Sequence, residues 1–145
     1  IYGYSNFICD SSGSICEVVD PDNPDDPVMS ALSKTVLPIW IEGSDAHTKE
    51  LVRRFDRAPK PMCYNEEFLN TAWADYANET GLSEVEIDPD TFIRWTFARA
   101  LAHRQPRYAK MAENWGIKVD ADAIASVRTE TDMIALVARA LEARA

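Results

Sequence analysis

Residues 6–14, "NFICDSSGS", join a short apolar run to an acid and a hydroxyl-rich turn. Asp10 ends the apolar run, and Ser11, Ser12 and Ser14 follow it. An apolar strand that delivers an acid to a small, hydroxyl-rich turn is a common way to build a phosphate or metal site. The same residues are also typical of a strand that simply ends, with Asp10 and the serines capping the turn. Both interpretations stay open.

A second group of polar side chains lies in "LAHRQPRYAKMA", residues 101–112. Arg104 stands one helical turn before Tyr108, so both side chains can face one cleft. A guanidinium in a cleft is well shaped to bind a pair of phosphate or carboxylate oxygens. The alternative is a structural role, in which Arg104 pairs locally and Tyr108 packs in the core.

Residues 49–60 gather five basic side chains in an otherwise acidic protein: Lys49, Arg53, Arg54, Arg57 and Lys60. An acidic protein that gathers cations in one segment could use them to bind a small anionic ligand. Ordinary helix surface charge explains the same pattern. The two readings of the basic side chains stay open.

The overall charge limits the classes of partner. The chain has 145 residues, a net charge of −9 and no Lys or Arg in residues 1–30. A nucleic-acid-binding protein needs a basic face, so this balance argues against nucleic acid and against anionic membrane surfaces. No apolar run is long enough to span a membrane. Three cysteines without a C-x-x-C pair favour a reducing cytoplasm over a disulfide or zinc framework.

The apolar pattern predicts alternating strands and helices. Strands are expected over residues 6–10, 35–42 and 116–120, with Pro38 marking an edge or a bulge. Helices are expected over residues 28–34, 45–57 and 66–79, with Asp26, Ser44 and Asn65 as their N-caps. Further helices are expected from Asp88–Pro89 onward, with a kink or restart at Pro106, and after a capping box at Thr129 and Asp132. This alternation predicts an α/β domain with a parallel sheet.

The order of these segments resembles the shikimate-kinase-like branch of the P-loop small-molecule kinases. "NFICDSSGS" is similar to the family's third strand and substrate loop, and "TVLPIWIEGSDAHTKELVRRF" to its fourth strand and following helix. "RAPKPMCY" looks like the lid, and "RALAHRQPRYAKMA" with "GIKVDAD" like the R-x-P-x-Y helix and fifth strand. The resemblance implies a three-layer α/β/α fold with a parallel sheet.

The chain departs from that family in one main respect, because it contains no G-x-x-x-x-G-K-[ST] loop. The resemblance therefore implies that residues 1–145 form the C-terminal part of a single P-loop kinase-like domain. The first two strands and the phosphate loop would be missing, and residues 58–90 would form a helical lid insert. The substrate loop also differs from the family's glycines, so shikimate is not the expected substrate.

The resemblance implies a role for each candidate residue, with ATP and Mg²⁺ as cofactors. Asp10 would hold the metal and act in catalysis together with Lys60 and Arg104. ATP phosphates would be bound by Arg54, Arg57 and Lys60. The small-molecule substrate would be bound by Ser11, Ser12, Ser14, Arg104 and Tyr108.

The function implied is phosphoryl transfer from ATP to an unidentified small molecule in the intact protein. Two alternatives stand beside it: a non-catalytic domain that binds a nucleotide or a partner, and an inactive fragment. Because the phosphate loop is missing, we expect the 145 residues alone not to turn over ATP. The sequence sets neither the phosphoryl acceptor nor the oligomeric state.

Overall fold

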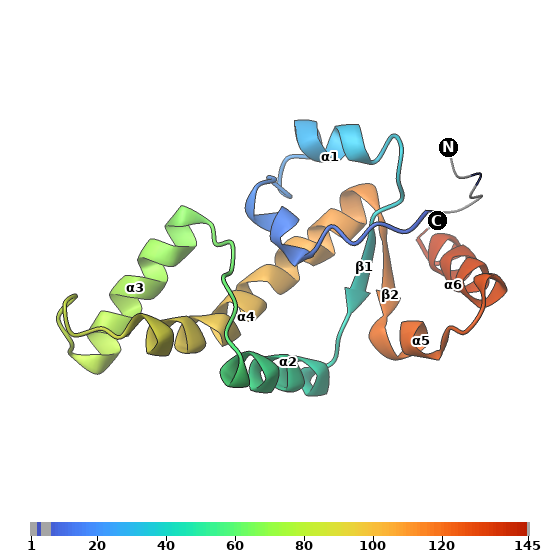
Figure 1. The fold of residues 1–145 in the computed structure, drawn as a ribbon. Helices are drawn as coiled ribbons and strands as arrows, with labels where there is room; N and C mark the ends of the chain where they lie inside the picture. The colour runs from blue at the N-terminus through green and yellow to red at the C-terminus, as the bar shows by residue number, and fades with distance from the viewer. Residues whose placement is uncertain (1–2, 4–6, 145) are drawn as a thin grey trace.

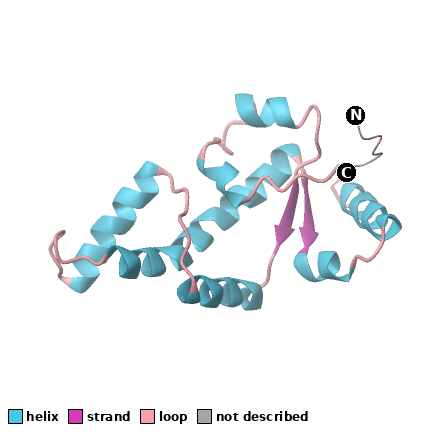
Figure 2. Ribbon diagram, viewed as in Figure 1, coloured by secondary structure: helices cyan, strands magenta, loops and turns pink. Residues whose placement is uncertain are grey.

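The computed structural model describes residues 3 and 7–144 and is mostly helical (Figures 1 and 2). Helices account for 63% of the structure. Within the described residues, the strands form a single two-stranded parallel sheet. The expected three-layer α/β/α P-loop fold is therefore wrong: helices dominate, and two strands cannot form the central layer of such a fold.

The sheet pairs β1 (Ile39–Glu42) with β2 (Ile117–Asp120) in parallel, with Ile39 opposite Ile117. Ile117 and Val119 point to the same face because side chains alternate along a strand. Both are buried against α5 (Ala121–Ser126) and α6 (Glu130–Glu142). The opposite face carries Trp40, whose ring centroid lies 6.4 Å from that of Tyr108. Helices thus cover both faces of a very narrow sheet.

Helix α4 (Pro89–Trp115) is the central element of the fold and contacts most of the others (Figure 1). Its N-terminal half packs against α2 (Asp45–Arg57) and α3 (Glu66–Thr80), and its C-terminal half leads into the sheet. The expected restart at Pro106 does not occur. A proline removes one backbone hydrogen bond, and buried side chains on both sides, Arg104 and Met111, keep the helix continuous.

Helix boundaries follow the caps that the sequence predicts. Asp26 accepts hydrogen bonds from the backbone N–H groups of Val28 and Met29 at the start of α1 (Pro27–Leu32). Side chains also cap α2, α3 and α6, and Gly81 ends α3 with φ of 70°, which a glycine adopts without strain. The capping residues of α2, α3 and α6 are Ser44, Asn65 and Thr129.

The strand expected over residues 6–10 is not found. Residues 7–10 are irregular, and residue 6 lies outside the described residues. Phe7 and Ile8 are exposed, so no neighbouring strand covers them. The chain then forms a short 3₁₀ helix, η1 (Gly13–Glu17). The strand expected over residues 35–42 is likewise shortened to β1.

The two strands begin at a close backbone approach. The N–H of Ile117 donates to the carbonyl oxygen of Pro38 over 2.9 Å. A Cβ at Gly116 would overlap that same oxygen, so a glycine is required there for spatial reasons. Pro38 therefore accepts the first bond of the sheet from β2, although it cannot donate one.

Candidate functional site

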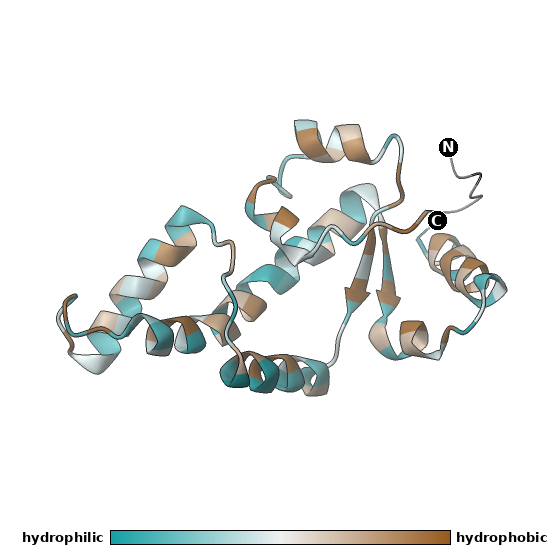
Figure 3. Ribbon diagram, viewed as in Figure 1, coloured by the Kyte–Doolittle hydropathy of each residue, from teal (hydrophilic) through white to brown (hydrophobic). Residues whose placement is uncertain are grey.

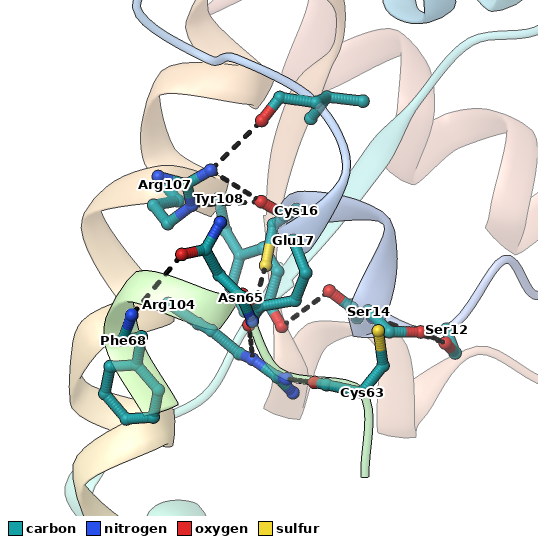
Figure 4. A network of polar contacts seen from close by, with 12 residues as sticks. Ser12, Ser14, Cys16, Glu17, Cys63, Asn65, Phe68, Arg104, Arg107 and Tyr108 are labelled. Carbon is teal, nitrogen blue, oxygen red and sulfur yellow. Dashed lines mark hydrogen bonds and ion pairs between the residues drawn. The ribbon is translucent and has the colours of Figure 1, made fainter. Parts of the chain in front are cut away.

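Arg104 lies in the interior, at the centre of the network in Figure 4. Its Nε donates to Glu17 Oε1 over 2.5 Å, and a second guanidinium nitrogen donates to the carbonyl oxygen of Cys63. The other oxygen of Glu17 accepts the backbone N–H of Asn65 over 2.9 Å. The ion pair thus joins α4, η1 and the connector that precedes α3.

This pair is buried and well satisfied. Burial lowers the pKa of Arg104, but the hydrogen bond and charge of Glu17 outweigh it and leave that pKa above its ordinary value. A buried ion pair is tolerated when hydrogen bonds satisfy its remaining atoms, as Cys63 and Asn65 do here. The geometry fits the structural role that the sequence left open for Arg104, but with the distant partner Glu17 in place of a local one. Its role in binding phosphate or substrate stays a prediction.

The same face of α4 anchors residues 13–24, which we name the anchored segment. Few of the backbone carbonyl groups of this segment accept hydrogen bonds from backbone N–H groups. Side chains of α4 donate to several of these carbonyls instead. Tyr108 donates to Gly13 over 3.0 Å, and Arg107 donates to Cys16 and Val19 (Figure 4). Two further donors from α4 reach the carbonyls of Pro21 and Pro24: Asn114 and Trp115.

Two titratable groups beside the ion pair are shifted by burial. Burial raises the pKa of the Tyr108 phenol and of the Cys16 thiol, and the charge of Glu17 raises the latter further. The Cys16 sulfur lies 3.9 Å from Glu17 Oε1. Both groups therefore stay protonated near neutral pH. The Tyr108 hydroxyl can then donate its hydrogen bond to Gly13, and the neutral Cys16 thiol can pack in the core.

Asp10 and the serines form a local turn. The Asp10 carboxylate accepts the backbone N–H of Ser12 over 2.8 Å, and the hydroxyls of Ser12 and Ser14 lie 2.7 Å apart. Ser11 is exposed beside them. No group of three or more His, Cys, Asp or Glu residues in the described part of the chain could hold a metal ion. The bonds fit the turn-capping interpretation, and the Mg²⁺ site stays a prediction.

The basic residues expected to bind ATP lie on or just after α2. Arg53 and Arg54 both donate to Glu50, over 2.6 and 2.9 Å, and lower its pKa to about 2. Arg57 and Lys60 are exposed and have no ion-pair partner among the described residues. The structure thus leaves these two cations available on the surface.

The structure brings together only some of the predicted site residues. Tyr108 binds the carbonyl of Gly13, between Ser12 and Ser14, and lies one turn from Arg104. Asp10 joins this group through the backbone N–H of Ser12, whereas no hydrogen bond or ion pair among the described residues joins Arg57 or Lys60 to it. Two open surface hollows, of about 200 and 330 Å³, are lined by none of the predicted site residues.

Sequence reasoning missed an exposed apolar stripe on and after α1. Val28, Leu32 and Val36 are 43%, 36% and 48% exposed, although all three are aliphatic. They follow one another at spacings of four residues, and the N–H of Val36 donates to the carbonyl of Leu32 over 3.0 Å. Met29 faces the core instead. The stripe therefore lies on and just after a helix whose buried residue is Met29, and Figure 3 shows hydrophobic residues along that helix.

An acidic segment precedes this stripe directly. Residues 20–26, "DPDNPDD", contain four aspartates, and the first Lys or Arg of the chain is Lys34. Asp26 is buried as the cap of α1, whereas Asp22 pairs with Lys110 on the surface. The carboxylate of Asp25 is exposed and has no partner in the described chain. The absence of Lys and Arg before Lys34 is the feature of the sequence that could have indicated this acidic surface.

Comparisons with known proteins add nothing to this geometry: no protein family, curated protein or solved structure matches the chain. Across the described residues, every helix is too short or too polar to cross a membrane. The functional argument therefore rests on the contacts and charges described above.

Proposed function

We propose that this chain is a non-catalytic partner-binding domain that docks a basic, apolar segment of another polypeptide. The docking surface consists of the stripe Val28, Leu32 and Val36 and the acidic residues 20–26, and we name it the α1 surface. The observation that carries the proposal is the exposure of three aliphatic side chains in a row beside Asp20 and Asp25, two exposed acids without an ion-pair partner among the described residues.

The apolar stripe supplies a gain in free energy on docking. Burying a whole aliphatic side chain is worth about 1.5–3 kcal/mol, so covering three half-exposed ones contributes about 1 kcal/mol each. Ordering of both partners offsets part of this gain. The apolar contacts alone therefore correspond to a dissociation constant of several millimolar at best, and the charges described next must supply any tighter binding.

The acidic residues determine the charge that the docking segment must carry. Asp20 and Asp25 are exposed at the N-terminal end of the stripe, and no cation precedes Lys34. An approaching acidic segment would be repelled, whereas Lys or Arg side chains would be attracted. Lysine and arginine can also lay their aliphatic stems over an apolar stripe while their charged ends reach the carboxylates.

This proposal corresponds to the alternative of a non-catalytic domain that binds a partner. No observation favours the other function, phosphoryl transfer. Phosphoryl transfer rested on the resemblance to a fold that the chain does not adopt. Arg104, its main candidate for contacting phosphate, is engaged by Glu17 and Cys63.

The three cysteines are unpaired, which supports the proposed cytoplasmic location.

The proposal is tested by calorimetric titration with a helical peptide built from leucine and lysine, and with the same peptide carrying glutamate in place of lysine. We expect only the lysine peptide to bind. Val28→Ser combined with Val36→Ser should weaken binding at least about tenfold, the effect of losing roughly 1.4 kcal/mol. Val85→Ser, at a residue that is 94% exposed in another loop, is the matched control. Equal binding of both peptides, or no effect of the double variant, would refute the proposal.

A further inference from the structure

The outer edge of β1 carries backbone groups that the sheet does not use. The N–H of Ile117 donates to the carbonyl of Pro38, so every second residue of β1 turns its backbone groups toward β2. The N–H and C=O groups of Ile39 and Ile41 therefore point to the opposite side. Within the described residues, neither makes a hydrogen bond outside the sheet, and Ile41 is 50% exposed. Such an open edge is a template for a further strand.

Residues 7–9, which we name the arm, have the composition of a strand but lack a strand partner. Phe7 and Ile8 are 84% and 78% exposed. No hydrogen bond among the described residues involves Phe7, Ile8 or Cys9. The chain after the arm is held on α4 through the carbonyl of Gly13. The arm runs across the direction of β1 rather than along it (Figure 1), so its own chain leaves both the arm and the edge unpaired.

We propose that the arm of a second copy of this chain adds to the outer edge of β1 as an antiparallel strand. In this mode of recognition, main-chain hydrogen bonds supply the affinity and alternate side chains supply the specificity. With Phe7 opposite Ile41 and Cys9 opposite Ile39, each pair exchanges two backbone hydrogen bonds. All the outward-pointing backbone groups of β1 then have partners.

The same register brings apolar side chains together on both faces of the sheet. Residues directly opposite each other in an antiparallel pair lie on the same face. Phe7 therefore covers the half-exposed side chain of Ile41. Ile8 lies beside Trp40, on the face that Tyr108 covers in the same chain. A slip of one residue would turn each of these side chains to the other face.

The charges around β1 select the antiparallel direction. Four acids lie at the carboxyl end of the sheet and at the starts of the helices that follow it: Glu42, Asp45, Asp120 and Asp122. Lys118 and His47 each contact one of them. A parallel arm would bring Asp10 toward this acidic end. In the antiparallel arrangement Asp10 lies opposite Pro38, on the side of Lys34, the nearest charged residue that precedes β1.

Each copy carries one arm and one open edge, so two copies can exchange arms reciprocally around a two-fold axis. This exchange closes a dimer and leaves neither edge of β1 open. None of these residues belongs to the α1 surface. The inference therefore goes beyond the proposed function and does not depend on it.

Analytical ultracentrifugation over a concentration series, with the thiols kept reduced, tests the inference. We expect the parent chain to form a concentration-dependent dimer. Phe7→Asp with Ile8→Asp disables the arm, Ile41→Lys disables the edge, and each should weaken dimerisation at least about tenfold. An equimolar mixture of the two variants should dimerise more strongly than either alone, because one intact arm can meet one intact edge.

Hydrogen exchange locates the contact. The amide of Ile41 points to the open edge, whereas the amide of Trp40 points to β2. Protection of Ile41 should rise with protein concentration, and protection of Trp40 should be present at every concentration. Protection of Ile41 in a chain that stays monomeric would place the arm on its own β1 and overturn the inference.

Two controls should dimerise like the parent chain. Val85→Asp adds a charge at another exposed apolar residue, and Val28→Ser with Val36→Ser alters only the α1 surface. Dimerisation of the arm variant or the edge variant at the strength of the parent, or a mixture that recovers nothing, would overturn the inference. A parent chain that stays monomeric but binds the leucine–lysine peptide would overturn the inference and leave the proposed function standing.

Discussion

At the scale of single residues, the Glu17–Arg104 pair holds three separate parts of the chain together. Its carboxylate also accepts from Asn65, and its guanidinium also donates to Cys63. Both side chains are almost completely buried. Removing one partner of such a pair leaves a buried charge without compensation, which costs much more than the pair itself contributes.

We therefore expect Arg104→Ala to lower the free energy of unfolding by about 3–5 kcal/mol, as measured by urea denaturation. The matched control is Arg54→Ala, which removes an exposed arginine from a pair with Glu50 and should cost at most about 1 kcal/mol. Similar, small losses for both variants would contradict the structural role of Arg104.

Cys16 gives a second prediction at this scale. Burial raises its pKa above the ordinary value of 9.0, and the charge of Glu17 raises it further. Two of the three thiols, Cys9 and Cys63, are exposed. A thiol reagent at pH 8 should therefore label those two quickly and Cys16 only when the chain unfolds. Rapid labelling of all three thiols in the native protein would count against the packing of η1 on α4.

The same shift predicts a pH dependence of stability. Because the folded-state pKa of Cys16 lies above the unfolded value of 9.0, its contribution is fully present below about pH 9. It is lost as the pH rises toward the folded-state pKa, since the unfolded chain then ionises first. Urea midpoints should fall over this range, and Cys16→Ala should reduce the fall. An identical decline in the variant would assign the effect to other groups.

At the scale of elements, local signals predicted the helices much better than the strands. Asp26, Ser44, Asn65 and Thr129 cap the helices that the sequence assigned to them, because capping depends on residues within one turn. Strands depend on distant partners. Residues 7–10 have the apolar composition of a strand but stay irregular, and side chains of α4 anchor the segment that follows them.

The start of the sheet gives a prediction for an element. Gly116→Ala should cost about 1–3 kcal/mol, the range of a steric overlap that forces the backbone to shift, because the new Cβ meets the carbonyl of Pro38. The amide of Ile117, which donates to that carbonyl, should lose protection from hydrogen exchange. In Gly81→Ala, where the space is open but φ is 70°, stability should fall without any change at Ile117.

At the scale of the whole molecule, the fold implied by the resemblance to a P-loop kinase was wrong, because the order of segments along the chain does not determine which strands pair. Within the described residues only two of the three expected strands form, and each has four residues. Arg104 and Tyr108 anchor residues 13–24, and their spacing on one helix could not indicate which distant segment they would contact. The sequence did not reveal the α1 surface, because the pattern of aliphatic residues in a short predicted helix does not show which of them are buried and which are exposed.

The central claim is that the α1 surface is a docking surface for basic, apolar segments. Its most direct test is to titrate the leucine–lysine peptide into isotopically labelled protein and follow the amide resonances by NMR. We expect the shifts to concentrate on residues 20–37 and to vanish in the Val28→Ser, Val36→Ser variant. Shifts that are absent, or that centre on another part of the molecule, would contradict the account.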